Sequence, residues 1–389
     1  MTLLSRLSVR GTSLALLCLA AVATLAEQPA NKSEGAVSAT SALHVKIDGG
    51  SIRLEGSGGD QISYLVRHSG SSKAHRRDTA PLYKVAAYTR GNTSWLVATR
   101  QGNHSNIRPV EFLVRVPREV ESVALETSGG DVSVQGVTSR IQVITSGGHL
   151  HIDDVRGAVS AETGGENIDV GAIGSDGHFR TGGGRISVDS IKGNLDAFTG
   201  GGSISLGTGM RNAVLQSGAG DVSVTFCGGE LIVQSGGGNL VLGDVGGPAD
   251  IRTEGGNLHL HSAKGFVRAH TGAGNIELDE IPAADAWADV GSILAKFTAS
   301  AGPRRNSSLQ TSIGDITVFL PADLPITVHA KVDLGGGQKI TSELPGMHIS
   351  PHQDGQDSPV FAEAKLNGGG PVLEVHAGNG NIFFKKLEH

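Results

Sequence analysis

The segment from Thr127 to His270 repeats every 18 residues, and this repeat restricts the possible fold more than any other feature of the chain. Each unit opens with Thr or Ser and has Gly at position 4, except the unit that carries Glu166. A ninth unit opens at Thr271 and then diverges. A short, fixed period is typical of repeat architectures in which the units stack on one another.

Within one unit, the apolar positions follow the period of β-strands with one buried face. Positions 6 and 8 alternate with polar residues, as at Ile186 and Val188, and positions 15 and 17 form a second pair, as at Leu231 and Val233. Gly-rich points between the strands predict tight corners. One coil cannot bury these side chains alone, so we expect an all-β parallel β-solenoid in which each coil covers the next.

The hand of the coil has two alternatives. Eighteen residues also fit three hexapeptides of a left-handed helix, but that version needs an aliphatic residue every six positions. Positions 12 and 18 are mostly polar here. The sequence therefore favours a right-handed β-helix, the usual hand of parallel crossovers.

The flanking segments predict how the chain is organised. Arg6 and Arg10 precede an apolar run that is too short to span a bilayer, which is the pattern of a secretory signal. The expected segments are a signal peptide over 1–26, a linker over 27–42, an N-terminal β cap region over 43–126, regular coils over 127–288, an inserted loop over 289–310, and C-terminal coils with a cap over 311–389. Caps are expected because a bare coil would leave an exposed sheet edge. We expect export to the periplasm, cell surface or extracellular space, without an integral membrane segment after signal removal.

Charge and cysteine content exclude some classes of function. The formal net charge is −6 and no basic footprint is present, so we expect no nucleic-acid partner. Removal of residues 1–26 would take away Cys18 and leave Cys227 without an intrachain disulfide partner. Cys227 falls on inward position 11, where we expect a buried, unreactive thiol.

Carboxylates are the first candidates for catalysis, because parallel β-solenoids often carry polysaccharide lyases and hydrolases. Asp153 and Asp189 share outward position 9 and lie two coils apart, about 9.6 Å by the strand spacing. No column of Lys or Arg accompanies them, so we expect a solvated face and not a catalytic pair.

Position 5 and the histidines are the candidate metal ligands. Calcium-binding repeats need a nine-residue period with a recurrent Asp, whereas position 5 includes Arg185. Asn239, Asn257 and Asn275 at that position predict a stacked amide ladder instead. The remaining candidates are the pairs His149/His151 and His259/His261, and His348 and His352 with Asp354 and Asp357 in a tail loop. No third ligand column accompanies either pair, so we assign no metal, cofactor or catalytic residue.

Three stretches carry a resemblance to a known family. They are LVRVPREVESVALETSGGDVSVQGV over 113–137, the TSGG and TGGG coil openings, and LEVHAGNGNIFF over 373–384. On these stretches the chain resembles the bacterial putative-adhesin family of exported β-solenoid domains, a group of unknown function. The resemblance covers residues 43–386. It implies the fold and brings no catalytic motif.

Two functions remain open. The first is a non-enzymatic exported adhesin-like scaffold that binds a surface partner, a protein or a glycan, through its solenoid face and loops. The alternative is a carbohydrate-active enzyme, a lyase or hydrolase, on a β-helix. Aromatic platforms would favour sugar binding, but Trp95 and Trp287 both fall outside the eight regular coils. We favour the scaffold, which needs no cofactor.

Overall fold

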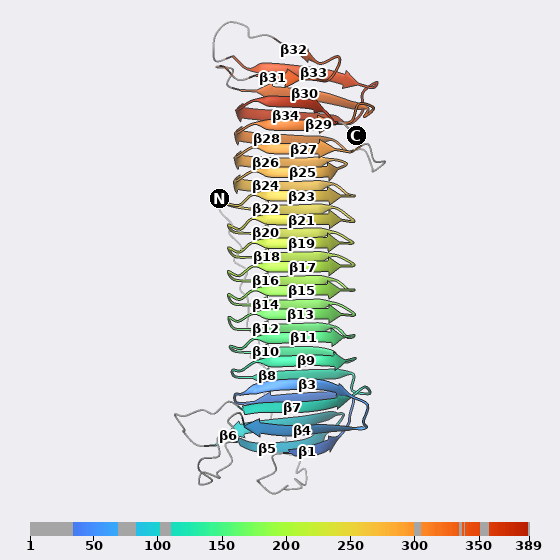
Figure 1. Ribbon diagram of the computed structural model, residues 1–389, viewed down its shortest axis with the longest axis vertical. Helices are drawn as coiled ribbons and strands as arrows, with labels where there is room; N and C mark the ends of the chain where they lie inside the picture. Colours follow the sequence, from blue (N-terminus) through green and yellow to red (C-terminus); the bar gives the residue numbers. More distant parts are fainter. Residues whose placement is uncertain are drawn as a thin grey trace, which may run out of the picture.

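Each 18-residue unit forms one coil that contributes one strand to each of two long parallel sheets (Figure 1). The computed structural model describes residues 34–68, 83–101, 110–298, 305–333, 337, 339–350 and 358–387. Within these ranges the regular secondary structure is entirely strand. The predicted all-β parallel β-solenoid is therefore confirmed, and its hand stays a prediction.

Both sheets run from one end of the molecule to the other, and the order of strands in space differs from the order in sequence only near the ends. In spatial order, sheet A contains β1 (Glu34–Ser38), β4 (Gln61–His68), β7 (Val110–Pro117), β3 (Ser51–Ser57), β9 (Val132–Val137), β11 (Leu150–Val155), β13 (Ile168–Ile173), β15 (Ile186–Ile191), β17 (Ile204–Gly209), β19 (Val222–Cys227), β21 (Leu240–Val245), β23 (Leu258–Ala263), β25 (Ile276–Ile281), β27 (Ile293–Phe297), β29 (Ile316–Leu320), β35 (Ile382–Lys386) and β31 (Ile340–Ser342). In the same direction, sheet B contains β5 (Tyr83–Arg90), β6 (Thr93–Arg100), β2 (Ala42–Ile47), β8 (Ser122–Thr127), β10 (Arg140–Thr145), β12 (Val159–Thr163), β14 (Gly177–Thr181), β16 (Leu195–Thr199), β18 (Ala213–Ser217), β20 (Leu231–Ser235), β22 (Ala249–Thr253), β24 (Val267–Ala273), β26 (Ala284–Val290), β28 (Ser307–Ile313), β34 (Val372–Asn379), β30 (Ile326–Val332), β33 (Val360–Leu366) and β32 (His348–Ile349).

Equivalent positions of successive coils pair directly, so every position of the repeat forms a column along the solenoid. Val188 pairs with Leu206, and Ser187 pairs with Ser205. Val188 is 1% exposed, whereas the two serines lie on the outer face, where the Ser205 hydroxyl donates a hydrogen bond to the Ser187 hydroxyl at 3.0 Å. The inward columns of the two sheets merge into one continuous aliphatic core. The predicted phase of the strands is therefore confirmed.

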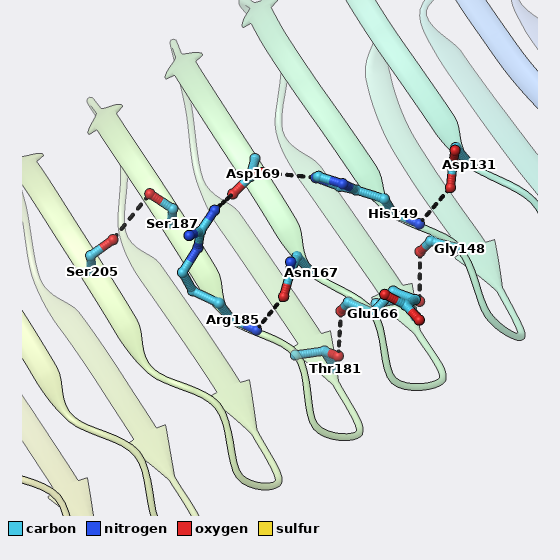
Figure 2. A network of polar contacts seen from close by, with 11 residues as sticks. Asp131, Gly148, His149, Glu166, Asn167, Asp169, Thr181, Arg185, Ser187 and Ser205 are labelled. Carbon is cyan, nitrogen blue, oxygen red and sulfur yellow. Dashed lines mark hydrogen bonds and ion pairs between the residues drawn. The ribbon is translucent and has the colours of Figure 1, made fainter.

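The hydroxyl at position 1 has a structural role that the apolar pattern did not reveal. Thr199 is fully buried and donates a hydrogen bond to the carbonyl oxygen of Gly184 in the preceding coil, at 2.8 Å. Thr181 makes the same bond to Glu166 at 2.7 Å (Figure 2). Because a buried carbonyl without a partner is costly, Thr or Ser recurs at this position.

Close approach of successive corners explains the glycine at position 4. A Cβ atom placed on Gly202 would lie 2.2 Å from the carbonyl oxygen of Gly184, which is too close for any side chain. A Cβ atom on Gly201, the preceding residue, would meet nothing within 4 Å. A side chain at Gly202 would therefore force the two coils to shift, whereas one at Gly201 would not. The unit that carries Glu166 shows that a coil can adjust to a side chain at position 4.

Side chains at position 5 link successive coils as the amide ladder predicts. The Asn239 Oδ1 atom accepts hydrogen bonds from the backbone N–H of Asn257 at 3.0 Å and from its amide group at 3.4 Å. The Asn257 Oδ1 atom accepts the backbone N–H of Asn275 at 2.9 Å. Asp131 and Asn167 accept the equivalent backbone N–H groups of His149 and Arg185 (Figure 2). The predicted ladder is present, but most of its hydrogen bonds run from a backbone N–H group to a side-chain oxygen and not from amide to amide.

The ends of the solenoid do not follow the sequence order. At the N-terminal end, the coil made of β2 and β3 lies between the coil of β6 and β7 and the coil of β8 and β9. At the C-terminal end, β34 and β35 lie between the coil of β28 and β29 and the outer strands β30 and β31. An early coil is therefore inserted inside the N-terminal end, and a late coil inside the C-terminal end.

Antiparallel strands close both ends, as expected for caps (Figure 1). Strands β4 and β5 pair antiparallel with β7 and β6, and β33 pairs antiparallel with β30. Residues 34–38, which were expected in a loose linker, form β1 and cover the free edge of β4. The signal peptide expected over 1–26 lies outside the described residues.

Parts of the segment expected as an inserted loop over 289–310 form strands in the structure. The ninth coil has lost one residue, so β26 and β27 continue the two sheets through Ile293–Phe297. Strand β28 begins at Ser307, which accepts a hydrogen bond from the backbone N–H of Ala284. The deletion of one residue shifts the 18-residue period, so the repeat is no longer evident in the sequence although the coils continue.

Candidate binding face

The outer faces of the two sheets carry different side chains. Sheet A presents short polar residues at many outward positions, such as Ser187, Ser205 and Ser223. Sheet B presents at position 18 a continuous run of side chains that end in a flat ring, amide or guanidinium group. The run begins with Arg180, and we call its part from Phe198 onward the planar column. The planar column consists of Phe198, Gln216, Gln234, Arg252, His270, Trp287, Gln310 and His376.

Neighbouring side chains at position 18 on the outer face of sheet B contact one another. The Arg180 guanidinium lies over the Phe198 ring at 5.7 Å, and the Gln216 amide donates a hydrogen bond to Gln234 at 3.5 Å. The rings of His270 and Trp287 lie 5.6 Å apart. Phe198 is 37% exposed and Trp287 is 51% exposed, so both rings remain accessible to a partner.

Side chains at position 16 flank the planar column and hold some of its members. Arg252 donates two hydrogen bonds to the Asp250 carboxylate, at 2.9 and 3.2 Å, and Gln310 donates one to Ser308 at 2.9 Å. The position-16 residues beside the planar column are Asp196, Val214, Ile232, Asp250, Arg268, Asp285, Ser308 and Glu374. These contacts pre-orient the flat groups toward solvent.

Both tryptophans lie on the outer face of sheet B, outside the eight regular coils as expected. Trp287 is on β26 and pairs with His270, in line with the regular repeats. Trp95 is on β6 in the position-16 column, where it stacks on His44 at 4.3 Å and on Tyr88 at 6.3 Å. The segments VRAHTGA (267–273) and ADAWADV (284–290) match when the repeat is shortened by one residue. This match could have predicted from the sequence that Trp287 follows His270 in the same column.

Two open depressions mark the surface. One, of about 290 Å³, lies on sheet B where Ala158, Ser160 and Gly177 leave space between Arg140 and His178. The other, of about 480 Å³, lies at the N-terminal cap beside Tyr64 and Arg115. Neither is enclosed, so both suit a shallow contact better than a reaction that must exclude water.

On the outer face of sheet A, ion pairs link adjacent coils (Figure 2). Asp169 accepts the Arg185 guanidinium at 2.9 Å and pairs with the His149 ring at 2.7 Å. Partial burial raises the pKa of the Asp169 carboxyl, but the hydrogen bonds and charges of Arg185 and His149 outweigh it and leave the pKa below its ordinary value. Asp169 therefore serves as a permanent anion in a structural contact.

The same grouping of a carboxylate, a histidine and a permanent cation recurs elsewhere. Hydrogen bonding from Lys46, helped by His44, lowers the pKa of Glu126. Hydrogen bonding from Lys331 likewise lowers the pKa of Asp333, which also contacts His376 at 2.7 Å. A carboxyl whose pKa is lowered is a poor general acid near neutral pH.

The candidate catalytic acids stand on strands two apart, as predicted, with β13 between them. The Asp153 carboxylate accepts the backbone N–H groups of Asp154 at 2.8 Å and Ala172 at 3.1 Å. Asp154 has a φ of 50°, so Asp153 stabilises a left-handed corner. Asp153 therefore has a local role in the fold, and its side-chain hydrogen bonds within the described residues go to backbone N–H groups.

A third ligand column, which the sequence did not show, stands beside His259. A ring nitrogen of His259 and one carboxylate oxygen each of Glu277 and Asp279 lie within 4.8 Å of one another. The Lys296 ammonium already lies 2.7 Å from Asp279 Oδ1, and His259 lies 3.2 Å from Oδ2. Burial raises the pKa of Asp279, but Lys296 and His259 together hold it below its ordinary value. The Asp279 carboxylate is thus already paired with the Lys296 ammonium and the His259 ring.

The other expected site residues separate. His151 is in register with Asp169 on the next strand, but it is the His149 ring that pairs with the Asp169 carboxylate, at 2.7 Å. His348 is exposed on β32, and His352, Asp354 and Asp357 lie outside the described residues. Cys227 is fully buried, and burial raises the pKa of its thiol, in agreement with an unreactive position.

The chain is similar to a known protein family and to several solved structures. The family model described as Toastrack DUF4097 matches residues 40–343. No curated protein matches the chain. The chain is similar to solved structures of a putative cell adhesion protein from Clostridium sporogenes (12% identity, 91% of this chain and 99% of that chain, TM-score 0.16), a putative adhesin from Bacteroides fragilis (14% identity, 92% and 98%, TM-score 0.19) and a putative lipid binding protein from Parabacteroides distasonis (10% identity, 92% and 98%, TM-score 0.16).

No helix within the described residues has the length and apolar character to cross a bilayer. The family match covers more than half of the chain and includes the N-terminal cap, all regular coils and the start of the C-terminal end. The protein belongs to the Toastrack DUF4097 family of β-solenoid domains of unknown function.

Proposed function

We propose that the protein is a non-enzymatic, exported, adhesin-like scaffold that holds a surface partner, a protein or a glycan, along its solenoid face and loops. The planar column carries this proposal. Its eight flat side chains stand on consecutive strands of one rigid sheet, at about 4.8 Å per step. Such a face offers many weak contacts in fixed order, which suits binding of an extended partner.

The polar clusters support binding over turnover. Asp169, Asp279, Glu126 and Asp333 have lowered pKa values and are paired with cations, so they do not supply a general acid near neutral pH. Asp153 is engaged by backbone N–H groups. A hydrolase or lyase would need a free acid and base facing one another across a substrate.

The proposal is tested by sedimentation with isolated bacterial cell envelopes, coupled to an assay for released soluble sugar. We expect the full chain to sediment with the envelopes and to release no sugar. Two charges placed on the planar column by Gln216→Glu with Gln234→Glu should abolish sedimentation, because buried like charges cannot be solvated at a contact. Catalytic release of sugar would replace the scaffold with the enzyme.

A matched control uses the same two coils. Ser205→Glu with Ser223→Glu adds the same charge to the outer face of sheet A. This variant should sediment like the unmodified protein. Equal loss in both double variants would show that the planar column is not the contact surface, and absence of any sedimentation by the unmodified chain would reject the scaffold.

Export has its own test. Mass spectrometry of the protein purified from its native host should find a mature N-terminus between Thr24 and Gln28. An intact N-terminus, or a lipid on Cys18, would contradict the proposed signal peptide.

A further inference from the structure

We propose that the planar column binds a single uncharged polysaccharide chain, which lies along the solenoid axis and stacks one of its sugars on Trp287. The inference rests on the proposed scaffold function and names its ligand and its site. It is carried by the spacing of the column, the accessibility of Trp287 and the charges beside it.

The spacing of the column fits a sugar polymer. In-register pairing from β16 to β34 places successive planar side chains about 4.8 Å apart, so that the column spans roughly 34 Å over seven steps. A pyranose ring in an extended chain advances by nearly the same length. Successive sugars can therefore meet successive side chains without either partner bending.

Trp287 provides the stacking surface. Its ring is 51% exposed, although it stands on a regular strand between His270 and Gln310. The contact with His270, at 5.6 Å with the planes tilted by 53°, steadies the ring without covering it. The electron-rich face of an aromatic ring attracts the C–H face of a pyranose, and this contact leaves the sugar hydroxyls free at the ring edges.

Hydrogen-bonding groups stand on either side of that surface. Arg252 and Gln310 present planar donors, and Gln310 also presents an acceptor, at steps next to or near Trp287. Asp285 adds an exposed acceptor on the same strand as Trp287. Sugar hydroxyls both donate and accept, so a mixed set of this kind can satisfy them.

The charges beside the column favour an uncharged chain. Four carboxylates (Asp196, Asp250, Asp285 and Glu374) stand at position 16 along the column. Asp250 is paired with Arg252, and Asp196 lies 3.9 Å from the Arg180 guanidinium. Asp285 and Glu374 remain against the one position-16 cation, Arg268. A nucleic acid or an acidic polysaccharide would bring its anions against these carboxylates, and repulsion would oppose binding.

The distribution of rings disfavours a folded protein as the ligand of this site. Phe198 and Trp287 lie five strands apart, and amide, guanidinium and imidazole groups separate them. Protein interfaces concentrate their aromatic and aliphatic anchors in a contiguous desolvated centre. A linear polymer with alternating apolar faces and hydroxyls matches the dispersed pattern.

The test is affinity electrophoresis and calorimetry on the full chain with defined probes. The probes are a soluble β-glucan, a soluble mannan, polygalacturonate, duplex DNA, and neutral oligosaccharides of two and eight sugars. We expect at least one neutral polysaccharide to retard the protein, and its eight-sugar fragment to bind more tightly than its two-sugar fragment. Polygalacturonate and DNA should not bind.

The variants assign the site. Trp287→Ala should weaken binding of the neutral polysaccharide about tenfold, and Trp287→Phe should retain most of it. Phe226→Ala is the matched control, because Phe226 is also exposed (37%) but stands in sheet A. It should bind as tightly as the unmodified protein.

Each other result overturns the inference. It fails if no neutral glycan binds, if Trp287→Ala binds normally, if fragment length has no effect, or if an anionic polymer binds better. Envelope binding that is lost after protease treatment of the envelopes would point to a protein partner, which rejects the glycan and leaves the scaffold function intact. Release of sugar from the probes would reject the scaffold itself.

Discussion

The hydroxyl of Thr199 donates a hydrogen bond to the carbonyl oxygen of Gly184, 15 residues earlier and one coil away, at 2.8 Å. The same oxygen also lies only 2.2 Å from the position that a Cβ atom of Gly202 would occupy. One carbonyl group thus explains two of the most regular features of the repeat, the hydroxyl at position 1 and the glycine at position 4.

Replacement of Thr199 by Val should destabilise the protein by about 0.5–1.5 kcal/mol, because the shape is kept while the hydrogen bond from the buried Thr199 hydroxyl to the Gly184 carbonyl is lost. Thr199→Ser retains the hydroxyl and should cost less. Urea unfolding followed by circular dichroism measures both. A Val variant as stable as the unmodified protein would remove the proposed role of this hydrogen bond.

Gly202→Ala should destabilise by about 1–3 kcal/mol, since the new methyl group meets backbone that cannot move without separating two coils. Gly201→Ala adds the same methyl group where nothing lies within 4 Å, so it should be neutral. The two unfolding midpoints, measured side by side, check the comparison. Similar losses in both variants would mean that flexibility of the corner, and not close approach, explains the glycines.

Val188→Asp should abolish soluble expression, because a carboxylate at a position only 1% exposed has no cation or water beside it in the aliphatic core. Ser187→Asp, one residue earlier on the outer face, should express as soluble protein. The measurement is soluble yield with a far-ultraviolet spectrum. Equal behaviour of the pair would contradict the observed strand phase.

Asp169 should make stability depend on pH in the acid range. Its pKa is lowered in the folded protein, so its ionised form contributes stability fully above the ordinary carboxyl pKa of about 3.9, and this contribution is lost as the pH falls through the lower folded value. The stability difference between the unmodified protein and Asp169→Asn should therefore be largest near pH 7 and should shrink below about pH 4.

Urea midpoints at several pH values between 3 and 7 measure this difference. Arg185→Gln removes a main cation beside Asp169 and should reduce the pH dependence in the same direction. A difference that stays constant over the whole range would show that the ion pair does not contribute through ionisation of Asp169.

The sequence predicted the coil stack because its evidence is local and repeated. Val188 and Ile204 each occupy an inward position that recurs in every unit, so strand phase followed from periodicity alone. The deletion of one residue in the ninth coil was enough to conceal β26 and the register of Trp287 with His270. The stack tolerates that deletion because each strand pairs with its neighbour, whatever the length of the corner between them.

The polar groups of the surface were harder to predict. His259 meets Asp279 one coil and two positions away, so a search down single columns does not find the pair. The planar column was also hidden, because its members share flat end groups and not one residue type. Contacts that cross columns depend on side-chain length and direction, which periodicity does not encode.

The insertion of β2 and β3 between two later coils has a consequence for the order of assembly. During synthesis from the N-terminus, β2 and β3 have no parallel neighbour until residues 93–137 have been made. This early segment therefore gains its final hydrogen bonds late. In the folded protein, β2 and β3 are each hydrogen-bonded to a parallel strand on both sides. A force pulling along the chain at Ala42 would have to shear two ladders together, which gives this end of the molecule mechanical resistance where a terminal strand at the edge would peel away.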